Sequence, residues 1–377
     1  MTPTAIDLFS GCGGLSTGLL DAGVQVVAGF DKDAPSIRAF DYNHSYRGCS
    51  GHILDLAAAS GEDLLKLAGV REVDILAGGP PCQSYSIAGK RMGLEDERGG
   101  LVHRFADLVR EIRPRVALFE NVPNFARFDE GRVLNSLIEM IEQSGYTVRH
   151  AILNAADYGV PQGRKRVFVV GIAGKRKDFD LPPLPTHSEA PSLFDETQAY
   201  RTAEDAIGDL PDVWEEAAKG IPNHEPTMHS EKMLEAFSRL EPGMRDKKSF
   251  HDRLHPERPS FTLRAGSGNF SPLRPVHYRY DRVVTVRESA RIQGFEDSFI
   301  WPDPLPRLQQ YRQVGNAVPP PLARAVIEHI ARYVGWELKP EKTKGDSSTR
   351  PPAFTTTHED RHADRMTRLR GASLGRG

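Results

Sequence analysis

A cysteine and a carboxylate occupy positions where the sequence predicts chemistry. Cys82 follows the apolar run Val73–Ala77, which predicts a buried strand, and Glu120 follows a second such run, Val116–Phe119. The carboxyl ends of parallel strands lie on one edge of a sheet, so both side chains are expected at the same cleft. There a thiolate is a nucleophile, and a carboxyl can protonate or hydrogen-bond a ring nitrogen while the thiolate attacks. Taken singly, a buried structural cysteine and a helix-capping carboxylate remain alternatives.

Two arginines in the segment Gln162–Arg166 are candidates for the same cleft. Alternation along an extended chain places Arg164 and Arg166 on one side. Their guanidinium groups suit a base carbonyl or a phosphate. A basic cluster on the surface is the alternative.

A glycine-rich turn predicts a cofactor that contains adenosine. Residues Asp7–Gly14 follow the first predicted strand and begin the first helix, so their glycines allow a ligand to approach a helix N-terminus. Asp31, at the end of the second strand, is placed to accept hydrogen bonds from a ribose. Dinucleotide enzymes and methyltransferases both use such a turn, and Asp31 alone could be an ordinary loop carboxylate.

The elements that position these residues predict an α/β protein with a doubly wound, mostly parallel sheet over residues 1–175. Strands are predicted at Ala5–Phe9, Val24–Phe30, Val73–Ala77, Val116–Phe119 and Arg166–Val170. Helices are predicted at Leu15–Ala22, Ala34–Tyr42, Gly61–Leu67, Leu101–Ile112 and Arg132–Ser144. This alternation stops after Lys175, so residues 176–304 are predicted to form a second, smaller domain. Residues 305–337 are expected to complete the first domain, and the polar stretch 338–377 is predicted to be a disordered tail.

Composition limits the compartment and the partners. No apolar run approaches the about 20 residues of a membrane helix, and the chain does not begin with a secretory signal, so a cytoplasmic location is expected. The 3 cysteines lack Cys-x-x-Cys spacing, and His224 and His229 lack further ligands nearby, so no metal is predicted. The net charge is −2, yet residues 243–291 hold 11 Lys and Arg against 5 acids. This excess fits either a phosphate-facing surface or a solvated face.

The order and spacing of the motifs resemble the DNA (cytosine-5) methyltransferase family across nearly the whole chain. The resemblance rests on Asp7-Leu8-Phe9-x-Gly11-x-Gly13-Gly14, Pro80-Pro81-Cys82-Gln83, Glu120-Asn121-Val122, Gln162-x-Arg164-x-Arg166, Arg258-Pro259-Ser260-x-Thr262, Arg287-Glu288-x-x-Arg291-x-Gln293-Gly294-Phe295 and Gly315-Asn316-Ala317-Val318. It implies a Rossmann-like, S-adenosylmethionine-dependent methyltransferase fold with a target-recognition domain. The sequence-reading region is then expected at about Gly174 to Glu257.

The resemblance also implies a reaction on a cytosine flipped out of the duplex, since C5 is inaccessible in a stacked pair. Cys82 would add to C6, and C5 would then take the methyl group of S-adenosylmethionine. Glu120 would hold N3 and Arg166 the base carbonyl. Arg164 and Asn121 would support that geometry.

By the same resemblance, seven residues are expected to bind the cofactor: Phe9, Gly11, Gly13, Asp31, Pro80, Leu101 and Asn316. Phe9 would stack near the adenine. The segment Ser86–Gly100 matches a loop that closes over DNA in the family. One departure is His52, which stands where the family has an aspartate that contacts the adenine.

The implied function is site-specific cytosine-5 methylation of double-stranded DNA by a bacterial monomer. A cognate restriction endonuclease, acting separately, is the expected companion. An RNA (tRNA) cytosine-5 methyltransferase of the same family is the alternative, although that branch usually carries Cys-Phe-Thr, which is absent here. A dinucleotide-dependent oxidoreductase and a DNA-binding regulator without catalysis are further alternatives.

Overall fold

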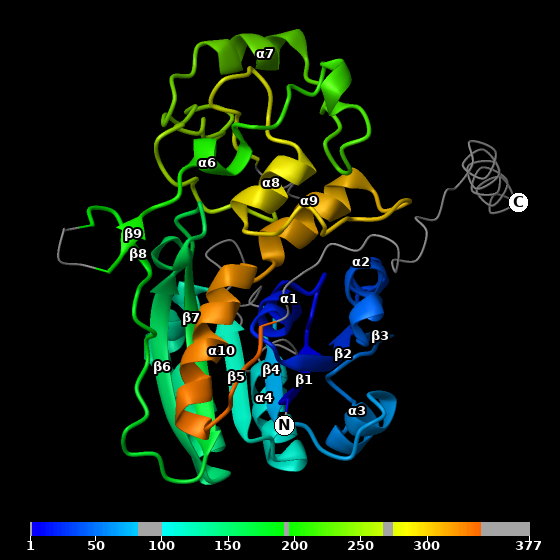
Figure 1. Ribbon diagram of the computed structural model, residues 1–377, viewed down its shortest axis with the longest axis vertical. Coiled ribbons are helices and arrows are strands. Elements are labelled where there is room, and N and C mark those ends of the chain that lie inside the picture. The colour runs from blue at the N-terminus through cyan, green and yellow to red at the C-terminus, as the bar shows by residue number, and fades with distance from the viewer. Residues whose placement is uncertain (1, 82–99, 192–195, 267–273, 341–377) are drawn as a thin grey trace, which may run out of the picture.

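A seven-stranded sheet forms the lower part of the molecule in Figure 1. The computed structural model describes residues 2–81, 100–191, 196–266 and 274–340. The strand order is β3-β2-β1-β4-β5-β7-β6, and β7 runs antiparallel to both of its neighbours. The strands are β1 (Thr4–Leu8), β2 (Gln25–Asp31), β3 (Ser50–Ile53), β4 (Ile75–Gly78), β5 (Val116–Asn121), β6 (Tyr146–Asn154) and β7 (Lys165–Ala173). The predicted doubly wound, mostly parallel sheet is confirmed.

Helices cover both faces of this sheet because alternate strand residues point to opposite sides. Ala5 packs in the core that α1 and α10 cover, whereas Ile6 packs in the core that α3, α4 and α5 cover. The helices of this unit are α1 (Gly14–Asp21), α2 (Ala34–His44), α3 (Gly61–Leu67), α4 (Gly100–Ile112), α5 (Arg132–Gln143) and α10 (Pro320–Val334). Glycines let α1 and α10 approach closely, since a Cβ added at Gly18 would lie 2.4 Å from the carbonyl oxygen of Pro320.

A second unit, drawn above the sheet in Figure 1, lacks strand–helix alternation in its described residues. It contains β8 (His187–Ser188), β9 (Gln198–Ala199), α6 (Ala203–Ile207), α7 (Glu231–Ser238) and α8 (Val286–Ile292), and α9 (Arg307–Asn316) packs against α8. Its core gathers Leu254, Val284 and Trp301, and Tyr311 of α9 joins it. Cys12 from the glycine-rich turn also packs there, so the two units share a boundary beside that turn. The exact domain limits stay a prediction, and residues 341–377 lie outside the described part of the chain.

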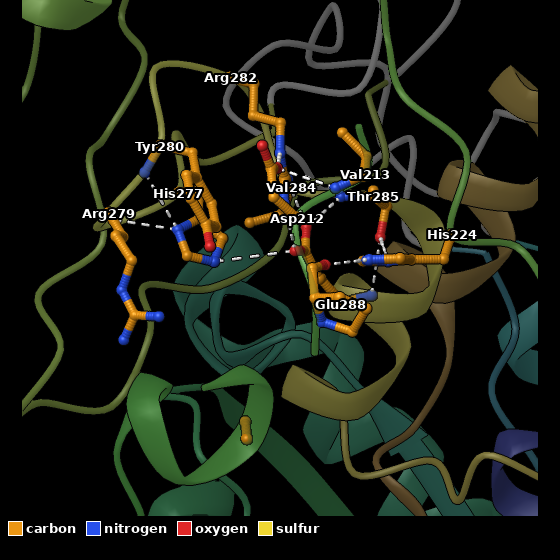
Figure 2. A network of polar contacts seen from close by, with 12 residues as sticks. Asp212, Val213, His224, His277, Arg279, Tyr280, Arg282, Val284, Thr285 and Glu288 are labelled. Carbon is orange, nitrogen blue, oxygen red and sulfur yellow. Dashed lines mark hydrogen bonds and ion pairs between the residues drawn. The ribbon is translucent and has the colours of Figure 1, made fainter. Parts of the chain in front are cut away.

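A buried ion-pair network stabilises the second unit (Figure 2). The Arg282 guanidinium donates to both carboxylate oxygens of Glu288, at 2.9 and 2.8 Å, and its Nε donates to Asp212 at 2.9 Å. Glu288 also accepts from the backbone N–H of Thr285 at the start of α8. Burial alone would raise the pKa of Glu288, but the hydrogen bonds and charge of Arg282 hold it below its ordinary value.

Replacing Glu288 with Gln is expected to lower the free energy of unfolding by about 3 kcal/mol, because it leaves the buried Arg282 short of a carboxylate. Urea denaturation measures this value. The matched control is Glu235→Gln, which breaks an exposed pair with Arg239 and should cost under about 1 kcal/mol. Equal losses in both variants would contradict the argument from burial.

Candidate active site

The ends of β4 and β5 bring the segment before Cys82 against Glu120. The side-chain amide of Asn121 donates to the carbonyl oxygen of Pro80 at 3.1 Å. A Cβ added at Gly79 would lie 2.9 Å from Oε2 of Glu120, so glycine permits this approach. Cys82 and the segment Ser86–Gly99 lie outside the described residues.

Glu120 forms a buried ion pair with Arg166. Nε of Arg166 lies 3.0 Å from Oε1 of Glu120, and about nine-tenths of each side chain is buried. Pairing of β5 with β7 sets this geometry, because Val167 is the register partner of Asn121. Burial raises the pKa of Glu120, and the charges of Arg166 and Arg164 only partly oppose it. The result is a carboxyl that holds a proton more readily than usual, beside a positioned guanidinium.

Arg164 is completely buried and joins three chain segments. Its guanidinium donates to the carbonyl oxygens of Gly315 at 2.7 Å, Ala317 at 3.2 Å and Leu263 at 3.2 Å. Its charge acts on Glu120, while Arg166 is the arginine that pairs with that carboxylate directly. Arg164 therefore positions the end of α9 rather than offering its donors to a ligand.

Two buried glutamines extend this junction. Nε2 of Gln162 donates to Oε1 of Gln293 at 2.6 Å, and Gln293 donates to the carbonyl oxygen of Ala317 at 2.5 Å. Gln162 also accepts from the backbone N–H of Leu263 at 2.9 Å. Both residues were part of the motif pattern, but their sequence context gave no indication that they contact each other.

The glycine-rich turn has a left-handed backbone at three positions. Phe9, Gly11 and Gly13 have φ values of 57°, 56° and 92°. For phenylalanine this conformation is strained, and such strain is concentrated at functional sites. Asp31, the last residue of β2, accepts a 2.9 Å hydrogen bond from the backbone N–H of Gly11.

The end of α9 packs against this turn. A Cβ added at Gly14 would lie 2.4 Å from the carbonyl oxygen of Val318, and the thiol of Cys12 lies 3.8 Å from the carbonyl oxygen of Gln313. The exposed Asn316 therefore lies beside the turn. Leu101 is buried in the first turn of α4.

Two polar side chains in this region remain without partners inside the described structure. Oγ of Ser10 is buried and makes no hydrogen bond, and neither end of the Gln313 side-chain amide makes one. A buried polar group without a partner is costly, so both groups fit a site that receives a polar ligand. Sequence reasoning did not single out either residue, because serine and glutamine are ordinary at such positions.

Asp7 is a buried carboxyl of the glycine-rich motif to which the sequence analysis gave no role of its own. It accepts a 2.6 Å hydrogen bond from the hydroxyl of Ser16 in the first turn of α1, where Gly13 gives no side-chain cap. Burial raises its pKa from 3.8 to about 7, opposed by the hydrogen bonds of Ser16 and assisted by the charges of Asp31 and Glu120. Asp7, on β1, thus accepts a hydrogen bond from the first turn of α1.

Replacing Asp7 with Asn is expected to change how stability depends on pH. The folded protein keeps the Asp7 proton up to about pH 7, whereas the unfolded chain releases it near 3.8, so this residue's contribution to stability declines as pH rises between those values. Urea unfolding should therefore show a smaller penalty for Asp7→Asn at pH 8 than at pH 5. The same penalty at both pH values would contradict the raised pKa.

His52 lies on β3, stacked on Phe30 with ring centroids 5.0 Å apart. The Ser50 hydroxyl lies 2.9 Å from Nε2 of His52 and 3.2 Å from the carbonyl oxygen of Val27. Burial lowers the pKa of His52, which favours a neutral ring.

The basic stretch 243–291 divides into three groups, and the smallest of them, Arg274 and Arg291, is half-buried. Arg253, Arg282 and Arg287 are buried and hydrogen-bonded inside the second unit. Its exposed cations are Arg245, Lys247, Lys248, Arg258, Arg264 and Arg279. The charge excess is therefore only in part a surface available to phosphates.

The structure offers no clear metal ligands in its described part. His224 contacts Thr285 and the carbonyl oxygen of Pro211, while His229 contacts the backbone N–H of Val283. Within residues 2–81, 100–191, 196–266 and 274–340, no three His, Cys, Asp or Glu side chains group as a metal site. None of the helices described there has the length and apolar character needed to span a bilayer.

Comparison with known proteins gives matches over nearly the whole chain. The model of the C-5 cytosine-specific DNA methylase family matches residues 4–332. The type II methyltransferase M.XorII of Xanthomonas oryzae pv. oryzae is 34% identical over 387 residues, covering 90% of this chain and 87% of that protein. The type II methyltransferase M1.HphI of Haemophilus parahaemolyticus is 34% identical over 353 residues, covering 88% and 87%.

Solved structures agree with this match. A DNA modification methyltransferase encoded within an E. coli prophage superposes with a TM-score of 0.72 at 27% identity, covering 89% of this chain and 100% of that one. The S. pombe Dnmt2 methyltransferase superposes with a TM-score of 0.65 over 89% and 100%. Its 17% identity shows likeness of fold alone.

Proposed function

The chain belongs to the C-5 cytosine-specific DNA methylase family, and on that premise we propose the donor, the target and the residue roles of its reaction. Membership confirms the resemblance found in the motifs, and the protein is a DNA (cytosine-5) methyltransferase. The oxidoreductase and regulator interpretations are thereby excluded. We propose S-adenosylmethionine as the methyl donor and one cytosine in a short duplex sequence as the target.

The buried pair of Glu120 and Arg166 beside Pro80 is the observation that carries the proposed roles. A cytosine offers N3 and O2 next to each other, and a carboxyl beside a guanidinium matches that edge. The raised pKa of Glu120 suits a group that gives a hydrogen bond or a proton to N3. The Arg166 guanidinium donates to O2 in the same arrangement.

The proposed reaction begins with the Cys82 thiolate adding to C6 of the flipped base. Glu120 protonates or hydrogen-bonds N3, so the electron pair displaced by the thiolate builds up at C5. S-adenosylmethionine, when bound, supplies a methyl group on a positively charged sulfur that leaves as a neutral thioether. After C5 takes the methyl group, the C5 proton passes to water, C5=C6 re-forms as the thiolate leaves, and N3 returns its proton to Glu120.

We propose that the cofactor lies over the glycine-rich turn. Gly11 and Gly13 give the turn its left-handed backbone, and the α1 N-terminus, without a side-chain cap, suits the carboxylate of the methionine part. Asp31 keeps lone pairs for the ribose, and Phe9 is the proposed adenine contact. The cofactor site is proposed to be lined by Pro80, Leu101 and Asn316. His52, with a ring that burial keeps neutral, stands in place of the family's aspartate.

Residues 176–304 are proposed as the target-recognition domain, and residues 1–175 with 305–337 as the catalytic domain. We further propose that the protein works as a monomer in the bacterial cytoplasm, with a cognate restriction endonuclease acting separately. The type II names of the relatives support this restriction context.

Expression in a host without cytosine-5 methylation tests the proposed reaction. Genome sequencing after chemical deamination should reveal protected cytosines within one short recurring sequence, absent from the empty-vector control. Soluble protein that binds S-adenosylmethionine but protects no genomic cytosine would overturn the DNA target, and labelling of total RNA would then test the alternative substrate.

A further inference from the structure

A short hairpin in the second unit presents a basic and aromatic tip. Its arms pair through the backbone, since Arg253 donates to the carbonyl oxygen of Met244 at 2.9 Å and Asp246 donates to that of His251 at 2.9 Å. Arg245 and Asp252 form a bridge between the arms. The tip is therefore residues 246–251, and we call residues 243–253 the basic hairpin.

The base of the basic hairpin is rigidly held. Arg245 donates to both carboxylate oxygens of Asp252, at 2.6 and 2.9 Å. The buried Arg253 donates to the carbonyl oxygen of Phe237 at 2.8 Å and to Asp281 at 2.9 Å. An anchored base with a short tip is preorganised, so little ordering is required on binding.

The tip exposes an aromatic side chain close to two lysine side chains. Phe250 is 58% exposed and has a left-handed φ of 60°. A strained backbone at an exposed phenylalanine has no packing benefit to offset it. Lys247 and Lys248 are exposed beside it, and the carboxylate of Asp246 is engaged by the N–H and hydroxyl of Ser249.

An ion pair and a hydrogen bond connect the basic hairpin to Arg164 of the candidate active site. Asp252 lies 3.5 Å from the guanidinium of Arg264. The preceding residue, Leu263, accepts a hydrogen bond from Arg164, whose charge acts on Glu120. Arg264 and Leu263 thus link the basic hairpin to Arg164, which also holds the end of α9.

We propose that the tip of the basic hairpin is a duplex-contacting element in which Phe250 stacks on a base and Lys247 and Lys248 contact phosphates. Lysines contact the phosphates of a duplex, and an aromatic ring can stack on a base by inserting at a base step or where a flipped base leaves its neighbours uncovered. This proposal rests on the proposed function, since it assigns a contact to the same DNA substrate.

Phe250→Ala tests the stacking contact with a 30-base-pair duplex that carries the sequence found by deamination sequencing. Its Kd should rise between about fivefold and about a hundredfold, with S-adenosylmethionine affinity and Tm unchanged. Phe250→Trp should restore the affinity and show tryptophan quenching on binding, whereas Phe250→Leu should not restore it. Trp214→Ala is the matched control, because Trp214 is 64% exposed but flanked by acidic residues, and it should bind as wild type.

The Lys247→Ala/Lys248→Ala variant tests the phosphate contacts. Its plot of log affinity against log salt should be less steep by about 0.9 for each phosphate that the variant no longer neutralises. This inference would be overturned if Phe250→Ala binds the duplex with wild-type affinity and the double lysine variant keeps the wild-type salt slope. The proposed function would still stand in that case if the wild type methylates the duplex. A wild type that neither binds nor methylates duplex DNA would instead overturn both.

Discussion

Replacing Cys82 with serine is expected to abolish methyl transfer, with a loss of at least about 10⁴-fold. A serine hydroxyl ionises far less readily than a thiol, so the addition to C6 that activates C5 does not occur. The segment before Cys82 is positioned by the contact of Pro80 with Asn121, which the substitution leaves in place. Mass spectrometry of 5-methylcytosine in a target duplex measures the loss.

The matched control for this substitution is Cys49→Ser, a buried cysteine away from the proposed active site. Cys12 is less suitable because it belongs to the glycine-rich turn, although burial raises its pKa to about 12 and makes it unreactive. A duplex containing 5-fluorocytosine should become covalently attached to wild type and Cys49→Ser only. Normal methylation by Cys82→Ser would remove Cys82 from the mechanism.

Replacing Glu120 with Gln is expected to slow methyl transfer by about 10²–10⁴-fold. Glutamine keeps the shape and can still accept from Arg166, but it gives no proton to N3. The pKa of Glu120 is raised, so the carboxyl ionises at a higher pH than an ordinary glutamate. Wild-type activity should fall as this ionisation takes place. The residual activity of the variant should lack this component, which single-turnover rates across pH would reveal.

Glu111→Gln is the control for the loss of a carboxylate paired with arginine, since Glu111 pairs with Arg104 on the surface of α4. Its methylation rate should match wild type. The Glu120 proposal fails if both variants slow the reaction equally, or if Glu120→Gln changes Tm as much as it changes the rate.

The sequence predicted the central strands well and missed the two edges. β1, β2, β4, β5 and β7 each contain apolar runs, because they are covered on both faces and flanked by other strands. β3 and β6 are the edge strands, where exposure permits Ser50, His52, Arg149 and His150. An edge strand forms by hydrogen bonding to its neighbouring strand and does not require an apolar sequence pattern. The local sequence does not identify that neighbour.

The chemistry of the site was predictable as residue types and less so as roles. Glu120 and Arg166 meet as the sheet edge predicts. Arg164, by contrast, donates to three carbonyl oxygens from residues about 100 and 150 positions away, a partnership without a local signal. The count of basic residues likewise did not reveal that Arg282 is buried and paired. Its acidic partners Asp212 and Glu288 come together around it only on folding.

The close packing of the glycine-rich turn on the end of α9 has a consequence for incomplete chains. Gly14 near the beginning contacts Val318 near the end, and Gly18 contacts Pro320. A chain that stops before residue 318 lacks one wall of the turn, so we expect it to be inactive in methylation. Two fragments divided after Lys175 should then be silent separately and active when mixed, which makes this enzyme a natural starting point for a split reporter.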